Sequence, residues 1–121
     1  MKINIKGTGI TLTPEIRAYL ERRLESIRKF FLDEGESSII DIELGKTTAH
    51  HQTGDIFRAE INIHVRKNSF RAVSEGEYLY SAIDDVKDEI FRVLSTNKEK
   101  RNSLMRRGGQ KIKAILRGLK H

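Results

Sequence analysis

The sequence predicts an α+β fold, a two-layer sandwich in which two helices pack on one face of a four-stranded sheet. Three observations support this class. Four segments alternate apolar and polar residues, as strands with one solvent-facing side do. Two longer segments carry apolar residues at helical spacing. The elements follow in the order β-α-β-β-β-α, and 121 residues suffice for one hydrophobic core.

The strand predictions rest on alternation. The third segment is the clearest, because Ile61 and Ile63 alternate with Glu60, Asn62 and His64. The links between the last three strands are short, so we expect an antiparallel meander with a tight turn at 67–68. The four predicted strands are residues 2–7, 37–45, 56–66 and 69–74.

Both helices show recognisable signals. The first is expected as one helix ending near Leu32, with Thr13 as N-cap, Pro14 in the first helical position and Glu15 at the positive end of the dipole. The second is expected over residues 79–100. Its apolar face consists of Leu79, Ile83, Val86, Ile90 and Leu94.

Positive charge is concentrated at the end of the chain. The formal charge is +6, yet residues 98–121 contain nine Lys/Arg and one Glu, so the remainder is slightly acidic. We therefore expect a globular domain over 1–101 and a flexible basic tail over 102–121. Paired glycines in "RRGGQ" suggest a hinge, and Ile112, Ile115, Leu116 and Leu119 suggest a short amphipathic helix that orders on contact. Such asymmetry points to a polyanionic partner.

Enzymatic chemistry is not predicted. His50 and His51 are adjacent in a loop and His64 falls on the solvent face, without the spacing of a metal site. The acidic residues of the second helix, Asp84, Asp85, Asp88 and Glu89, all avoid its apolar face and are expected in solvent. No nucleophile–base pattern or phosphate-binding glycine loop occurs. We expect no cofactor, no metal and no small-molecule substrate.

Basic residues on the helix flanks are the candidate binding residues. Lys and Arg beside aromatic side chains suit phosphate contact combined with base stacking. On the first helix these are Arg17, Arg22, Arg28 and Lys29, with Arg23 expected to extend outward along the seam between the helices. On the second, Lys87 and Lys98 share a flank with Tyr80 and Phe91.

Four stretches resemble the bacterial ribosome hibernation-promoting factor and ribosome-associated inhibitor family, also called the sigma-54 modulation protein family. They are "ITLTPEIRAYLERRL", "HHQTGDIFRAEINIHV", "FRAVSEGEYLYSAID" and "NKEKR", within residues 1–101. The resemblance implies a non-enzymatic, cytoplasmic translation inhibitor that acts in ribosome hibernation. Such proteins bind ribosomal RNA of the small subunit in its decoding channel and block messenger and transfer RNA.

The resemblance also indicates individual residues. Arg17 and Arg23 match basic positions of the family's first helix, and Lys29 matches one in some members. Tyr80 matches an aromatic expected to pack. Tyr78 departs from the family's frequent acidic N-cap, and the basic tail fits neither common version of the family. Arg92, Lys98 and Lys100 match basic positions late in the family's second helix, whereas Lys87 matches no family position and rests on its place beside the aromatics alone. The predicted RNA-binding residues are Arg17, Arg23, Lys29, Lys87, Arg92, Lys98, Lys100, Arg101, Arg106 and Arg107.

Two other classes of protein also fit the sequence. A general double-stranded-RNA-binding module shares a small sheet with helices on one face. A protein-interaction or transcription-modulating module would contact no RNA. A role at a membrane surface is disfavoured, because the amphipathic end has no aromatic residue beyond Phe91. We expect a protein that is monomeric when free.

Overall fold

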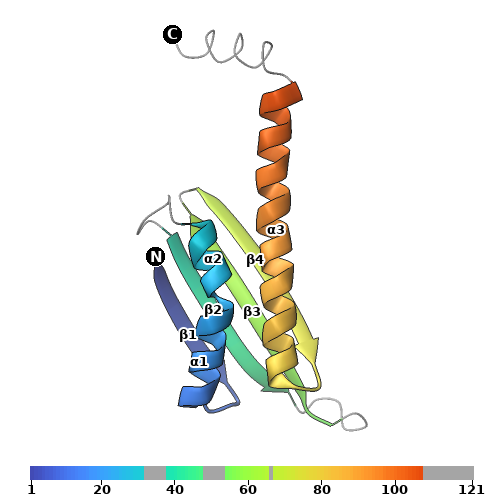
Figure 1. Ribbon diagram of the computed structural model, residues 1–121. Coiled ribbons are helices and arrows are strands. Elements are labelled where there is room, and N and C mark those ends of the chain that lie inside the picture. Colours follow the sequence, from blue (N-terminus) through green and yellow to red (C-terminus); the bar gives the residue numbers. More distant parts are fainter. Residues whose placement is uncertain (32–37, 48–53, 66, 108–121) are drawn as a thin grey trace. The chain divides into compact units, whose positions relative to one another are not determined.

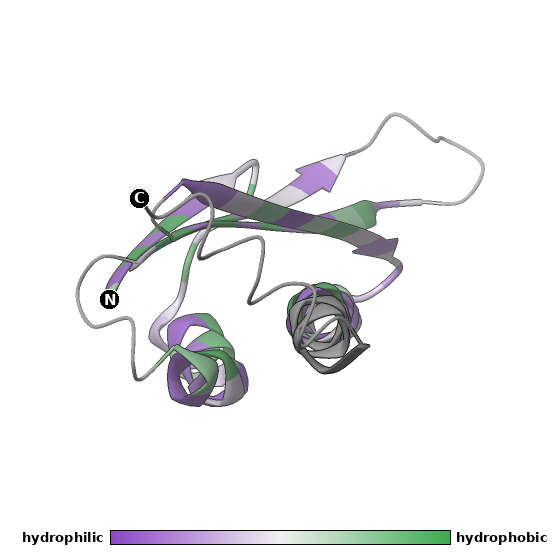
Figure 2. Ribbon diagram, turned by 90° about the horizontal axis from the view of Figure 1, so that it is seen from above, coloured by the Kyte–Doolittle hydropathy of each residue, from purple (hydrophilic) through white to green (hydrophobic). Residues whose placement is uncertain are grey.

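The computed structural model describes residues 1–31, 38–47, 54–65 and 67–107, with side chains to Lys98. It divides into two compact units, Met1–Phe91 and Arg92–His121. The predicted order β-α-β-β-β-α and the α+β class are confirmed (Figure 1). In the first unit the helices all lie on one face of the sheet (Figure 2). No helix in the described part of the chain is long and apolar enough to cross a membrane.

The sheet has the strand order β1-β2-β3-β4. β1 and β2 pair in parallel, because a helical crossover joins them, while β2–β3 and β3–β4 pair antiparallel and confirm the meander. The turn was predicted at 67–68, but Asn68 already belongs to β4, where it pairs with Val65. The prediction was therefore one residue too late. The strands are β1 (Lys2–Thr8), β2 (Ser38–Thr47), β3 (Ile56–Val65) and β4 (Asn68–Gly76).

The first predicted helix is divided into α1 (Pro14–Arg23) and α2 (Glu25–Phe30). Its start is as expected, since the Thr13 hydroxyl accepts a hydrogen bond from the Ile16 N–H at 3.2 Å. The prediction of one continuous helix was wrong at Leu24. There the Ile27 N–H bonds to the Leu24 carbonyl at 3.0 Å, a tighter three-residue spacing. Leu24 is fully buried, so packing holds this junction in place.

The last helix, α3 (Leu79–Arg107), extends beyond the predicted end at Lys100. The reason is visible in the sequence, because no glycine or proline occurs between Leu79 and Gly108. Residues 79–91 of α3 contain four acidic residues and one lysine, whereas residues 92–107 contain six basic residues and one glutamate. Arg106 and Arg107 in the last turn complement the negative end of the helix dipole, whereas the first turn has no acidic residue. The predicted glycine hinge and terminal amphipathic helix lie outside the described residues.

The core of the first unit lies between the helices and the sheet. Ile3, Ile5 and Ile16 are only half-buried, because they lie toward the margin of this layer. The fully covered apolar side chains come from every described helix and from β2, β3 and β4, as the alternation predicts. They are Leu20, Leu24, Ile27, Phe31, Ile40, Ile42, Leu44, Ala59, Ile61, Ile63, Val65, Ala72, Ala82, Ile83, Val86 and Ile90.

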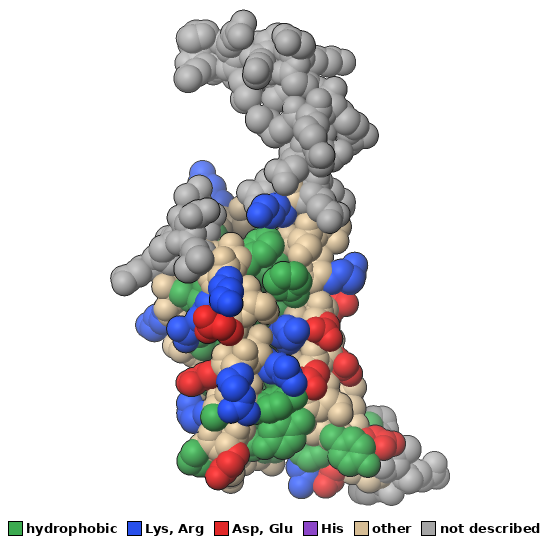
Figure 3. Space-filling model, in the orientation of Figure 1, with side chains coloured by type: hydrophobic (Ala, Val, Ile, Leu, Met, Phe, Trp, Pro, Cys, Tyr) green, Lys and Arg blue, Asp and Glu red, His purple; other side chains and the backbone are tan. Residues whose placement is uncertain are grey.

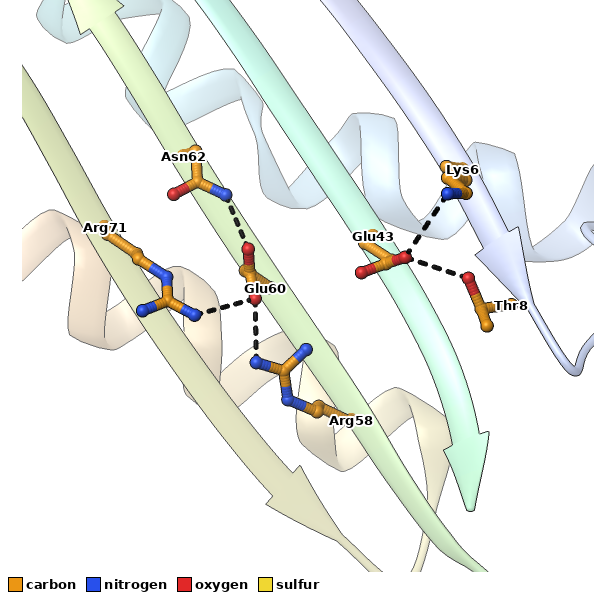
Figure 4. Close-up of polar contacts among 7 residues, drawn as sticks. All are labelled: Lys6, Thr8, Glu43, Arg58, Glu60, Asn62 and Arg71. Atoms are coloured by element: carbon orange, nitrogen blue, oxygen red, sulfur yellow. Dashed lines mark hydrogen bonds and ion pairs between the residues drawn. The ribbon is translucent and has the colours of Figure 1, made fainter.

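The outer face of the sheet is polar and internally paired (Figure 4). Glu60 on β3 accepts hydrogen bonds from Asn62 at 2.7 Å, Arg58 at 2.7 Å and Arg71 at 3.1 Å. Its side chain is only 16% exposed. The bond from Asn62 and those from the two guanidinium groups lower the pKa of Glu60 to about 2. The sheet face therefore neutralises its own charges and offers little attraction to a polyanion.

Replacing Glu60 by glutamine is expected to lower the free energy of unfolding by about 2 kcal/mol at pH 7. The pKa of Glu60 is lower in the folded protein than its ordinary 4.5. The contribution of the Glu60 carboxylate to the free energy of unfolding is therefore complete above about pH 4.5 and is lost as the pH falls toward 2. Urea unfolding of both proteins at several pH values checks this, and Glu75→Gln on exposed β4 is the control. A difference that persists unchanged at pH 2.5 contradicts the assignment.

Candidate nucleic-acid interface

The predicted RNA-binding side chains occupy different surroundings. Arg17 and Lys29 are exposed on α1 and α2. Lys87 is half-buried on α3 and pairs with Asp88 at 2.7 Å. Arg92 and Lys98 are exposed on the part of α3 that belongs to the second unit. Lys100, Arg101, Arg106 and Arg107 lie on the backbone of α3, but their side chains are outside the described part of the structure.

Figure 3 views the helix-bearing face of the first unit. Lys and Arg side chains lie over α1, α2 and the seam toward α3, with acidic side chains among them, and further acidic side chains follow the outer flank of α3. Exposed basic side chains on α1 and α2 include those of Arg17, Arg22, Arg28 and Lys29.

Arg23 lies partly exposed along the seam between the helices, as expected, but its guanidinium group is held there by two partners. Its Nε lies 2.8 Å from Asp84 Oδ1 on α3, and its Nη2 donates to the Tyr19 hydroxyl at 3.0 Å. Tyr19 in turn donates to Asp84 at 2.7 Å, and the guanidinium lies 4.8 Å from the centre of the Tyr19 ring. The Tyr19 hydrogen bond and the Asp84 charge raise the pKa of Arg23. These three residues form a clamp between α1 and α3.

Aromatic rings reinforce the same seam. Tyr80 packs edge-on against Tyr19 with ring centres 4.6 Å apart, as expected for a packing role. Phe30 of α2 meets Phe91 of α3 in the same manner at 5.9 Å. Edge-to-face pairs are favourable contacts. The seam is therefore held at two levels, by the Tyr19 clamp and by the phenylalanine pair.

Sequence reasoning missed the partners of Arg23. Asp84 was expected in solvent, but its side chain is 39% exposed and holds both Arg23 and Tyr19. A signal existed in the spacing, because Tyr19 and Arg23 lie four residues apart on α1, as do Tyr80 and Asp84 on α3. Periodicity within each helix does not reveal which turns face each other, so the pairing required the structure.

Replacing Asp84 by asparagine distinguishes two roles for Arg23. If the guanidinium positions α1 against α3, this change is expected to weaken nucleic-acid binding about two- to fivefold and lower the melting temperature by a few degrees. If Arg23 contacts phosphate directly, removing its counter-ion strengthens binding. We expect weaker binding, measured by filter binding and thermal unfolding. Asp85→Asn, exposed on the same helix, is the matched control.

Of the three histidine candidates, only His64 lies among the described residues. His64 is exposed, as predicted, and hydrogen-bonds Ser69 at 2.9 Å. His50 and His51 lie outside the described residues. Within the described ranges, no group of three metal-ligating side chains comes together.

The sequence is similar to that of known ribosome-associated proteins. The family described as "Sigma 54 modulation protein / S30EA ribosomal protein" matches residues 3–102. A ribosome hibernation promoting factor of Klebsiella oxytoca is 29% identical, over 83% of this chain and 96% of that protein. A ribosome hibernation promotion factor of Picosynechococcus is 34% identical, over 83% of this chain and 50% of that protein.

Two solved structures share the fold. A ribosomal subunit interface protein from Coxiella burnetii aligns with a TM-score of 0.66 at 20% identity, covering 82% of this chain and 99% of that one. The N-terminal domain of Thermus thermophilus Protein Y aligns with a TM-score of 0.63 at 24% identity, covering 78% and 96%. With the match over residues 3–102, the chain belongs to the Sigma 54 modulation protein / S30EA ribosomal protein family.

Proposed function

We propose that this protein is a cytoplasmic ribosome hibernation factor that binds the small ribosomal subunit in its decoding channel. There it occupies space needed by messenger and transfer RNA and so inhibits translation. Membership of the family supports a ribosomal role. The observation that carries the proposal for this chain is the partition of its charge between the two structural units.

The two units differ strongly in net charge. Residues 1–91 contain thirteen Lys/Arg and sixteen Asp/Glu, a net charge of −3, whereas residues 92–121 contain ten Lys/Arg and one Glu, a net charge of +9. These two segments are the two compact units of the chain. Contacts between Lys/Arg and phosphate release counterions and supply affinity. The acidic first unit limits indiscriminate binding to other RNA.

The proposal assigns different tasks to the predicted residues. Arg92, Lys98, Lys100 and Arg101 supply the main phosphate contacts, and Arg106 and Arg107 extend them. Arg17 and Lys29 provide a second set of cations on α1 and α2. Arg23 positions α1 against α3 through Asp84, and Lys87 is already neutralised by Asp88. Structured RNA is then recognised through shape and phosphate rather than through base sequence.

A competition experiment tests the proposed function. Small subunits are loaded with labelled messenger RNA and initiator transfer RNA, and the full-length protein is titrated in. Loss of both labels with a midpoint that rises with RNA concentration is expected, because the ligands share one channel. If the protein and both RNAs remain bound together to the small subunit, the proposed location is wrong. An excess of duplex RNA that removes the protein from the subunit supports the general RNA-binding module instead.

A further inference from the structure

Lys87 belongs to the row of α3 side chains that faces α1 and α2. Tyr80, Asp84 and Phe91 flank it at helical spacing, so all four side chains share one side of the helix. The other three members of this row contact side chains of α1 or α2. The Lys87 side chain is only 25% exposed. Lys87 is therefore a cation of the seam between the helices.

The carboxylate of the next residue neutralises this lysine. The Lys87 Nζ lies 2.7 Å from Asp88 Oδ1, and the Asp88 side chain is 70% exposed. Asp84, one turn earlier, is engaged by Arg23 at 2.8 Å instead. Asp88 is thus more accessible to solvent than the lysine that it holds. A phosphate that approaches Lys87 must therefore displace this negative charge or lie beside it.

The ion pair changes what the seam offers to RNA. Lys87 is the one basic residue within residues 79–91, the part of α3 that belongs to the first unit. Arg22, Arg28 and Lys29 are exposed on α1 and α2, and they attract the phosphates of any RNA. A free Lys87 would extend these cations onto α3. Because Asp88 holds it, the first unit gains no available cation on this helix.

We propose that Asp88 is a specificity-determining residue that, by neutralising Lys87, keeps double-stranded RNA of arbitrary sequence off the seam. Non-specific binding depends almost entirely on phosphate contacts, so each available cation strengthens it. A misplaced negative charge rejects an unwanted partner without any loss of contacts to the right one. This inference rests on the proposed function, in which the small subunit is bound mainly through the basic part of α3.

The variant Asp88→Asn tests the proposal in the full-length chain. Its affinity for an RNA duplex of about 16 base pairs is expected to rise about three- to tenfold, measured by fluorescence anisotropy. The log–log salt slope grows by roughly 0.7 to 0.9, because one phosphate contact is added. Affinity for purified small subunits is expected to rise by a smaller factor, so the preference for them falls.

The outcomes separate this inference from the proposed function. Unchanged duplex affinity in Asp88→Asn, with binding to small subunits intact, overturns the inference and leaves the proposed function standing. A rise for small subunits that equals or exceeds the rise for the duplex also overturns the inference. If the wild-type protein does not bind small subunits, the proposed function fails and the inference fails with it.

Three further variants test whether Asp88 acts through Lys87. Adding Lys87→Gln to Asp88→Asn is expected to abolish the gain in duplex affinity, and a gain that persists overturns the proposal. Asp88→Glu keeps the carboxylate and is expected to retain the wild-type preference. Asp85→Asn removes the same charge from an exposed position on α3 and is expected to change duplex affinity less than about twofold. Equal gains in Asp85→Asn and Asp88→Asn would mean that net charge alone determines binding, which contradicts the proposal.

Discussion

Replacing Arg92, Lys98, Lys100 and Arg101 together by glutamine is expected to weaken binding to small ribosomal subunits by about 100- to 1000-fold at low salt. These residues lie on α3 where its charge changes from acidic to basic. Glutamine is a good helix former, so the helix itself is preserved. Each lost phosphate contact also reduces the salt dependence of binding by roughly 0.7 to 0.9 in log–log slope. Fluorescence anisotropy with labelled protein measures both quantities.

The matched control removes four positive charges from the first unit instead of from α3. Lys2, Lys6, Lys46 and Lys67 are all exposed in the first unit, and their replacement by glutamine also lowers the net charge by four. We expect less than about a fivefold change in affinity, because long-range attraction is screened beyond roughly 10 Å. Equal losses in the two variants would mean that total charge, rather than its position on α3, determines binding.

Leu24→Ala is expected to lower the free energy of unfolding by about 3 to 5 kcal/mol. Leu24 is fully buried at the junction between α1 and α2, where its carbonyl accepts hydrogen bonds from Ile27 and Arg28. Truncation leaves a cavity at the point where the chain changes from one helix to the next. Urea denaturation monitored by circular dichroism measures the loss.

A second variant distinguishes packing from backbone propensity. Leu24→Met keeps most of the volume and is expected to cost less than about 1.5 kcal/mol. If alanine, the better helix former, instead stabilises the protein, the junction is a local backbone defect that packing does not maintain.

The fold was predictable because its signals are local. Alternation in residues such as Ile61 and Ile63, and the cap formed by Thr13 and Pro14, each depend on a few neighbouring residues. The interruption at Leu24 was not predictable in this way. The helical spacing of apolar residues continues through it, and only the hydrogen bond from the Ile27 N–H to the Leu24 carbonyl shows that the chain tightens there. The full length of α3 could have been found, since nothing before Gly108 ends a helix.

The candidate site was predictable as a set of cations but not as a set of contacts. Counting charges along the chain identified the basic end without any structure. Whether a given cation is available depends on neighbours distant in sequence, and Arg23 lies 61 positions before the Asp84 that holds it. Tyr78 was noted only as a departure from the family pattern. Its exposure emerges from the three-dimensional arrangement.

The most direct test of the account is the affinity of the full-length protein for purified small and large ribosomal subunits, measured at several salt concentrations. The account predicts saturable binding to the small subunit, with a dissociation constant that rises steeply with salt and a log–log slope of magnitude about 3 or more. Affinity for the small subunit that stays constant from low to moderate salt, or a preference for the large subunit, would contradict it.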